Sequence, residues 1–331
     1  MRIEPWMHLV LRKSLPLLFS GLLLSTPSAW AQTSTNAAPD ASQTAEAYVK
    51  FGRTNGANQD LKSAIAAFDE AIRIDPKYAP AYENRGVARM LQHNLDDALI
   101  DFDKAIELDP KYQEAYYNRG TTKAQKGDFD GSISDFDHAI ELNPKFASAF
   151  YNRGHAKYFK GDLDGALADT NQAIELDPSS PYSFFIRGLI RHAKEDSQGA
   201  SSDFQQSATY GFPFGAFWLW SLKMEAGDRG LAGSDLAEYA KKPQLFKEGD
   251  WPTFIIGFLL GKVTEEKLLS RAKEGDESKN RVCEAYFYLG MYKSYAGDAK
   301  GAQDAYQKAV DSGAKDSEEY IEAQRRLKSA P

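Results

Sequence analysis

The chain has almost no cysteine, few histidines and none of the short motifs that mark common enzyme classes. Its one cysteine, Cys283, excludes an intramolecular disulfide framework and any zinc site built from several cysteines. The five histidines never occur in His-x-x-x-His or HExxH spacing, and neither Gly-x-Ser-x-Gly nor a phosphate loop is present. We therefore expect no metal, no cofactor and no enzymatic activity, and we expect Cys283 to be a buried structural thiol.

An excess of positive charge is also missing. The 331 residues contain 40 Lys and Arg against 47 Asp and Glu, a net charge of −7. A nucleic-acid partner needs a basic face for its phosphates, so this balance argues against one. With 42% hydrophobic and 26% charged residues, the composition is that of a globular protein with ample core.

No apolar run is long enough to span a membrane as a helix. The run from Leu15 to Leu24 follows Arg2, Arg12 and Lys13, and it falls well short of the roughly 20 residues required. It ends near Ala29-Trp30-Ala31, a cleavage site with small residues, so residues 1–31 are typical of a secretory signal peptide. No cysteine follows for lipid attachment. We expect a periplasmic protein without a transmembrane anchor; an uncleaved N-terminal anchor is the alternative.

The sequence does have a 34-residue period. Prolines recur at this spacing, and a glycine follows each of them ten residues later: Pro76, Pro110, Pro144 and Pro178, with Gly86, Gly120, Gly154 and Gly188. Each period holds two helical patterns, separated in several places by a Gly-Asp pair such as Gly127-Asp128. The glycine suits a left-handed helix C-cap and the aspartate suits the start of the next helix.

These positions resemble the tetratricopeptide repeat (TPR), a helix hairpin of 34 residues. The family pattern of small and bulky positions is found in residues 45–78, 79–112, 113–146, 147–180, 181–212 and 283–316, with Ser132 and Thr170 as departures. The resemblance implies an all-α fold, a right-handed superhelical stack of helix hairpins. It divides the chain into a signal peptide (residues 1–31), a flexible leader (32–44), a TPR array (45–212), a divergent helical segment (213–282), a C-terminal TPR (283–316) and a capping helix (317–331).

Arginine and aspartate change together within this one chain. Four repeats have arginine before the glycine and aspartate 16 residues later: Arg85, Arg119, Arg153 and Arg187, with Asp101, Asp135, Asp169 and Asp203. The repeats with Phe51 and Leu289 instead have Ala67 and Ala305. This pattern predicts an ion pair that links the two helices of a hairpin. Anion binding by the arginines is the alternative, but it leaves the aspartates unexplained.

The TPR resemblance also places a binding groove on the first helix of each hairpin. The residues expected to line it include a stripe of rings: Tyr117, Tyr151, His155, Tyr158, Phe159, Tyr182, Phe185 and His192. Such rings suit the docking of peptides or proteins. Asn84, Asn118 and Asn152 resemble asparagines that hold a ligand in peptide-binding TPR grooves. The alternative is that the rings pack against neighbouring hairpins or a C-terminal segment.

Residues 213–282 interrupt the period, and the C-terminal third is similar to the NlpI family of periplasmic TPR lipoproteins. The matching residues include Pro213-Phe214, Trp218-Leu219, Trp251, Phe258, Leu260-Gly261, Glu265, Leu268, residues 287–290, Gly297-Asp298, Ala309-Val310 and Glu319. The resemblance implies an adaptor that forms homodimers and scaffolds peptidoglycan hydrolases, in some cases with a protease. The chain lacks that family's lipid-bearing cysteine.

The sequence thus predicts a non-enzymatic periplasmic adaptor that binds proteins or peptides through its groove. One alternative is a chaperone-like holder of unfolded or C-terminal peptides. The other is an enzyme whose site lies in residues 213–282, the segment that the repeat does not dictate.

Overall fold

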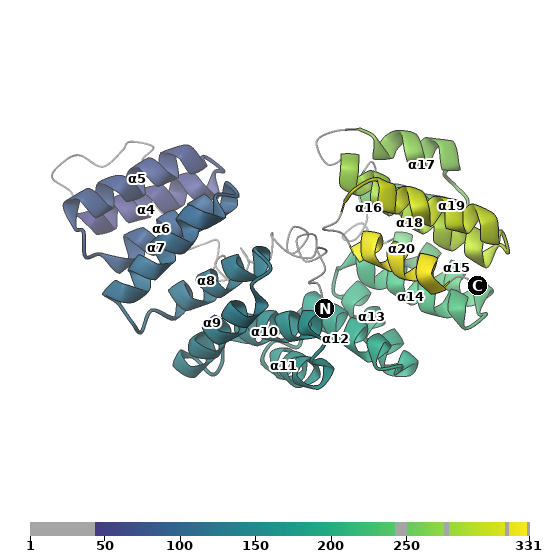
Figure 1. Ribbon diagram of the computed structural model, residues 1–331, viewed down its shortest axis with the longest axis horizontal. Coiled ribbons are helices and arrows are strands. Elements are labelled where there is room, and N and C mark those ends of the chain that lie inside the picture. The colour runs from purple at the N-terminus through teal and green to yellow at the C-terminus, as the bar shows by residue number, and fades with distance from the viewer. Residues whose placement is uncertain (1–43, 242–249, 275–277, 315–317, 330–331) are drawn as a thin grey trace. The chain divides into compact units, whose positions relative to one another are not determined.

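The computed structural model describes residues 44–241, 250–274, 278–314 and 318–329, and all regular secondary structure in these ranges is helical (Figure 1). The predicted all-α fold is therefore confirmed. The predicted signal peptide and nearly all of the predicted leader, residues 1–43, lie outside the described residues. None of the helices in the described ranges combines the length and the apolar character needed to cross a bilayer.

Successive helices pack as hairpins in the predicted order. The pairs are α4 (Ala45–Ala57) with α5 (Leu61–Ile74), α6 (Ala79–Leu91) with α7 (Leu95–Leu108), α8 (Gln113–Gln125) with α9 (Phe129–Leu142), α12 (Pro181–Ala193) with α13 (Ser197–Thr209), and α18 (Ser278–Tyr295) with α19 (Ala299–Asp311). Helices α10 (Ala147–Lys160) and α11 (Leu163–Leu176) continue the same alternation along the chain.

The chain divides into two compact units after Gly165. Among the described residues, the first unit holds α4 to α10, and the second runs from Ala166 within α11 to α20. In the first unit every second helix also packs against the first helix of the next repeat. The first helices contact one another in order, α4 with α6, α6 with α8 and α8 with α10, so they form one continuous row.

Small residues allow the two helices of a hairpin to approach closely. A Cβ atom on Gly86 would lie 2.7 Å from Cε1 of Phe102, which is fully buried, so only glycine fits there. Two departures from the family pattern are accommodated differently. Thr170 donates its hydroxyl to the Ala166 carbonyl at 2.8 Å, which satisfies the polar group. Ser132 is fully buried, but its hydroxyl has no hydrogen-bond partner in the described part of the chain.

The Gly-Asp turns have the predicted geometry. Gly127, Gly161 and Gly297 adopt positive φ angles of 83°, 82° and 85°. The Asp128 carboxylate then accepts a hydrogen bond from the Gly131 amide at 2.9 Å and caps the next helix. Three hairpins lack glycine at this place, so Gln59, His93 and Glu195 take φ angles of 63°, 62° and 63° instead. A side chain with a Cβ atom is strained in this conformation.

Replacing His93 with glycine is therefore expected to raise the free energy of unfolding by about 1 kcal/mol, because the left-handed region costs a residue with a Cβ atom roughly that much. Urea denaturation measures the change. The opposite substitution, Gly127→Ala, is the control and should destabilise the protein by a similar amount. A His93→Gly variant less stable than the parent would contradict this explanation of the turn.

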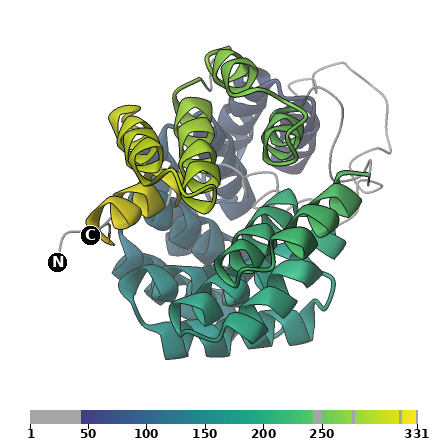
Figure 2. The ribbon, with the colours of Figure 1, turned by 90° about the vertical axis from the view of Figure 1, so that its right-hand side faces the viewer.

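The second unit also contains helices outside the predicted repeats. Its further helices are α14 (Pro213–Glu225), α15 (Arg229–Ala240), α16 (Trp251–Leu259), α17 (Glu265–Ala272) and α20 (Glu318–Ser329). Figure 2 shows α20, in yellow, beside the helices that precede it, and it contacts both α18 and α19. The Trp251 indole donates to Glu284 at 2.6 Å and ties α16 to α18. Helix α18 begins at Ser278, before the predicted repeat start at residue 283, because residues 278–282 contain no proline or glycine. The buried Cys283 therefore lies inside the helix rather than at its start.

Candidate protein-binding surface

The repeat arginines are bound within the scaffold. Arg119 donates to Asp135 through Nε at 3.0 Å and Nη2 at 2.6 Å, and to Asp103 through Nη1 at 2.7 Å. The equivalent contacts join Arg85 to Asp101 and Asp69, and Arg187 to Asp203 and Asn171. The predicted pair within a hairpin is confirmed in these three repeats. The second contact, to the preceding hairpin, was not predicted, and it leaves these guanidinium groups no role as an anion site.

The three asparagines are buried and engaged in contacts within the first unit. Asn118 donates through Nδ2 to Glu83 at 2.7 Å, and Asn152 donates to the Tyr117 hydroxyl at 2.9 Å. Asn84 donates to the Pro80 carbonyl of its own helix at 2.8 Å. The first two bonds join neighbouring repeats. A ligand can therefore bind these asparagines only through their polar atoms that are not engaged in these hydrogen bonds.

Several predicted groove rings pack against neighbouring hairpins. Tyr117 is buried, with its ring centroid 4.8 Å from that of Phe146, and burial raises the pKa of its hydroxyl. In the second unit the buried Phe185 lies against Phe212 and Phe204. Two partly buried rings of that unit pack similarly, Tyr182 on Phe212 at 4.8 Å and His192 on Trp218 at 5.7 Å.

Four rings on α10 contact one another and are here called the α10 ring cluster: Tyr151, His155, Tyr158 and Phe159. Phe159 also stacks on Phe129 of α9 at a centroid distance of 5.5 Å. Tyr151 stacks on His155 at a centroid distance of 6.0 Å, and Phe159 meets His155 edge-on at 4.5 Å and Tyr158 at 5.6 Å. Tyr151, Tyr158 and Phe159 are only partly buried. His155 is buried, and desolvation lowers its pKa to about 3, so the imidazole is neutral at physiological pH.

Several buried polar atoms on the row of first helices have no hydrogen-bond partner in the described part of the chain. They include Nδ2 of Asn55 on α4, Nε2 of Gln125 on α8 and Nε2 of His155 on α10. Gln125 occupies repeat position 13, as Phe159 does one repeat later. Sequence reasoning selected the aromatic residues at these positions and passed over glutamine, although the repeat register already marked its place.

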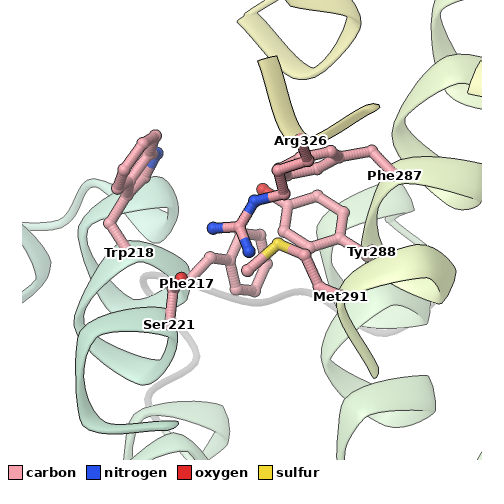
Figure 3. Close-up of a pocket in the computed structure, with 7 residues that line it drawn as sticks. All are labelled: Phe217, Trp218, Ser221, Phe287, Tyr288, Met291 and Arg326. Atoms are coloured by element: carbon pink, nitrogen blue, oxygen red, sulfur yellow. The ribbon is translucent and has the colours of Figure 1, made fainter. Parts of the chain in front are cut away.

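The second unit contains a small pocket between α14, α18 and α20 (Figure 3). Its lining is mostly apolar: Phe217, Trp218, Ser221, Phe287, Tyr288, Met291 and Arg326. The Arg326 side chain comes from α20 and donates to Glu225 at 2.9 Å. The space that the pocket encloses is far smaller than that of a typical small-molecule site, so the pocket suits a side chain rather than a cofactor. In the described part of the chain, no group of three or more His, Cys, Asp or Glu side chains is arranged to hold a metal ion.

Sequence profiles described as tetratricopeptide repeat or TPR repeat match residues 45–78, 79–112, 102–133, 122–161 and 147–180. Residues 45–180 are tetratricopeptide repeats. A search of curated proteins found no match to the chain.

Solved TPR structures are similar to the chain beyond these repeats. A tetratricopeptide repeat protein from Parabacteroides merdae shares 16% identity with a TM-score of 0.51, and the match covers 86% of this chain and 97% of that one. The pilF protein of Pseudomonas aeruginosa shares 15% identity with a TM-score of 0.53, covering 63% of this chain and 94% of that one. At these identities the likeness shows the fold alone, and it extends the TPR-like hairpin fold past residue 180.

Proposed function

We propose that this protein is a non-enzymatic scaffold that binds other proteins or peptides through the first helices of its TPR hairpins. The α10 ring cluster carries the proposal. Tyr151, Tyr158 and Phe159 are only partly buried, although the repeat pattern requires no aromatic residue at their positions. Tyrosine and phenylalanine supply large contact areas at low entropic cost, and they are enriched at protein interfaces. We expect affinities of about a micromolar, as is usual for transient contacts.

The proposed place of work is the periplasm. The signal-peptide pattern of residues 1–31 supports export, and the similarity of the C-terminal third to the NlpI family supports peptidoglycan hydrolases or a protease as partners. The absence of a cysteine after the apolar run supports a form without a lipid anchor. The same resemblance supports a homodimer, and a monomeric mass in light scattering at micromolar concentration would contradict that part.

Replacing Tyr151 and Tyr158 together with alanine is expected to reduce capture of folded partners at least tenfold, because the partner loses the two partly exposed tyrosine rings of the cluster. Affinity capture from periplasmic extract, quantified by mass spectrometry, measures the loss. The matched control is Ile100→Ala on α7, a large apolar side chain that is 63% exposed and outside the first-helix row. Unchanged capture by the double tyrosine variant would refute the proposed surface.

The alternative functions predict different results in binding and hydrolysis assays. A chaperone-like holder would bind denatured clients and ignore folded hydrolases. An enzyme would release fragments from purified cell-wall sacculi without any added protein, and the scaffold would not.

A further inference from the structure

We infer that the contact between α6 and α8 is a pH-sensitive joint in the row of first helices. The joint is closed while the carboxyl group of Glu83 carries a proton, and it opens locally when that group is ionised. Such a joint is a property of the scaffold itself, so it does not depend on the proposed function.

Two joints between neighbouring first helices use the same repeat positions with different chemistry. In both, the asparagine at position 6 of one repeat donates to the side chain at position 5 of the repeat before it. Between α8 and α10, Asn152 donates to the neutral Tyr117 hydroxyl at 2.9 Å. Between α6 and α8, Asn118 donates instead to the carboxyl group of Glu83 at 2.7 Å. The second joint therefore contains an ionisable group where the first has a neutral one.

The joint between α4 and α6 has a third chemistry at these positions. Position 5 is the buried Val49, whose side chain cannot accept a hydrogen bond. The asparagine at position 6, Asn84, donates to the Pro80 carbonyl of its own helix at 2.8 Å. Of the three side chains at position 5, only that of Glu83 can change its charge near neutral pH.

The carboxyl group of Glu83 is buried, and the groups bonded to it are neutral. Its side chain is closed off from solvent, and besides the Asn118 amide the Tyr112 hydroxyl lies 3.4 Å from its Oε2 atom. Hydrogen bonds from neutral groups offset only part of the cost of burying a carboxylate. A protonated carboxyl group avoids that cost, and its O–H can donate to the Tyr112 hydroxyl.

The charged groups around Glu83 come from helices on both sides of α6. Arg53 on α4 attracts the carboxylate and Glu114 on α8 repels it, so ionisation favours separation of Glu83 from α8. Burial has the largest effect, and it raises the pKa of Glu83 to about 7. On the other two neighbours of α6, aspartates are bound by Arg85: Asp69 of α5 and Asp101 of α7.

The repeat architecture allows this joint to open without unfolding a hairpin. In a solenoid the stability is approximately a sum of terms for single repeats and for the interfaces between neighbours. Helix α6 stays packed on α7 and α8 stays packed on α9, since those contacts lie within hairpins. Ionisation of Glu83 therefore weakens one interface of the row and leaves the hairpins on either side intact.

Thiol labelling tests the opening of the joint. Thr122 on α8 is fully buried and contacts Met90 of α6, with 3.3 Å between Oγ1 and Sδ. The Thr122→Cys variant of the full chain therefore carries a thiol that a reagent reaches when the joint opens. Labelling is followed by mass spectrometry and divided by the rate of an unstructured cysteine peptide, which removes the effect of pH on the thiol itself.

The corrected rate is expected to rise about tenfold between about pH 6 and about pH 8, because the carboxyl group has a pKa of about 7 in the closed joint and of 4.5 in water. Ala156→Cys is the matched control and should show no rise. Ala156 is buried at the same repeat position of α10, next to the neutral joint. The natural Cys283, buried in the second unit, is the reference within each chain.

Glu83→Gln keeps the shape of the side chain but cannot ionise, so adding it to Thr122→Cys should abolish the rise. Glu114→Gln removes the repelling charge and lowers the pKa of Glu83, so it should make the rise smaller. Circular dichroism confirms that each variant is folded. A rise that persists with Glu83→Gln, or equal rises at positions 122, 156 and 283, would overturn the inference. No partner takes part in the assay, so either result leaves the proposed function unaffected.

Discussion

Replacing Asp135 with alanine is expected to lower the free energy of unfolding by about 3 kcal/mol, because two partly buried cations lose their shared partner. The carboxylate is only 3% exposed and accepts from Arg119 at 2.6 Å and from Lys123 at 2.8 Å. Removing one partner of a buried ion pair costs more than the pair contributes, since the remaining charge stays desolvated. Urea denaturation of the parent and the variant measures the difference.

The same arginine supplies the control. Asp103 bonds Arg119 at 2.7 Å from the other side, but its side chain is 63% exposed. Asp103→Ala should therefore cost less than about 1 kcal/mol, as exposed ion pairs usually do. Equal losses in the two variants would show that burial does not govern the strength of these arginine contacts.

The buried carboxyl group of Glu83 is expected to make the stability of the fold depend strongly on pH. Burial raises its pKa from 4.5 to about 7, a nearby Glu114 adds to the rise, and Arg53, Asn118 and Tyr112 oppose it. An acid whose pKa is higher in the folded state favours folding while it is protonated. This contribution is complete below pH 4.5 and is lost as the pH rises through 7.

The parent protein is therefore expected to lose about 3 kcal/mol of unfolding free energy as the pH rises from about 5 to about 8, since one pKa unit corresponds to about 1.4 kcal/mol. The Glu83→Gln variant should not show this loss. Unfolding midpoints at the two pH values measure the change relative to the parent. Glu107→Gln alters an exposed carboxylate and should keep the parental pH dependence. If Glu83→Gln also keeps it, Glu83 is ionised in the folded protein and the raised pKa is wrong.

The sequence predicted the parts of the fold that depend on spacing within one repeat. The 34-residue period placed the hairpins, Gly127 and Asp128 marked a turn with the expected geometry, and the shared variation of arginine and aspartate identified the pair between Arg119 and Asp135. Each of these features arises from residues of one hairpin, whose geometry the repeat pattern defines.

Contacts between repeats were harder to predict because they depend on how one hairpin packs on the next. Asp69 and Asp103 also recur at the repeat spacing, but their bonds to the following arginines appear only in the structure. Tyr117 and Asn152, both assigned to a binding groove, bond to each other between repeats. No motif in the sequence marks Glu83, yet it is buried and bonded to Asn118 and Tyr112.

Site-specific photo-crosslinking in living cells tests whether partners bind at the first helices. A photoreactive amino acid replaces Tyr158 in the α10 ring cluster or, in a matched strain, the exposed Ile100 on α7. Adducts with a small set of folded envelope proteins are expected from position 158, and none of these from position 100. The same adducts from both positions, or adducts from position 100 alone, would contradict binding through the first helices.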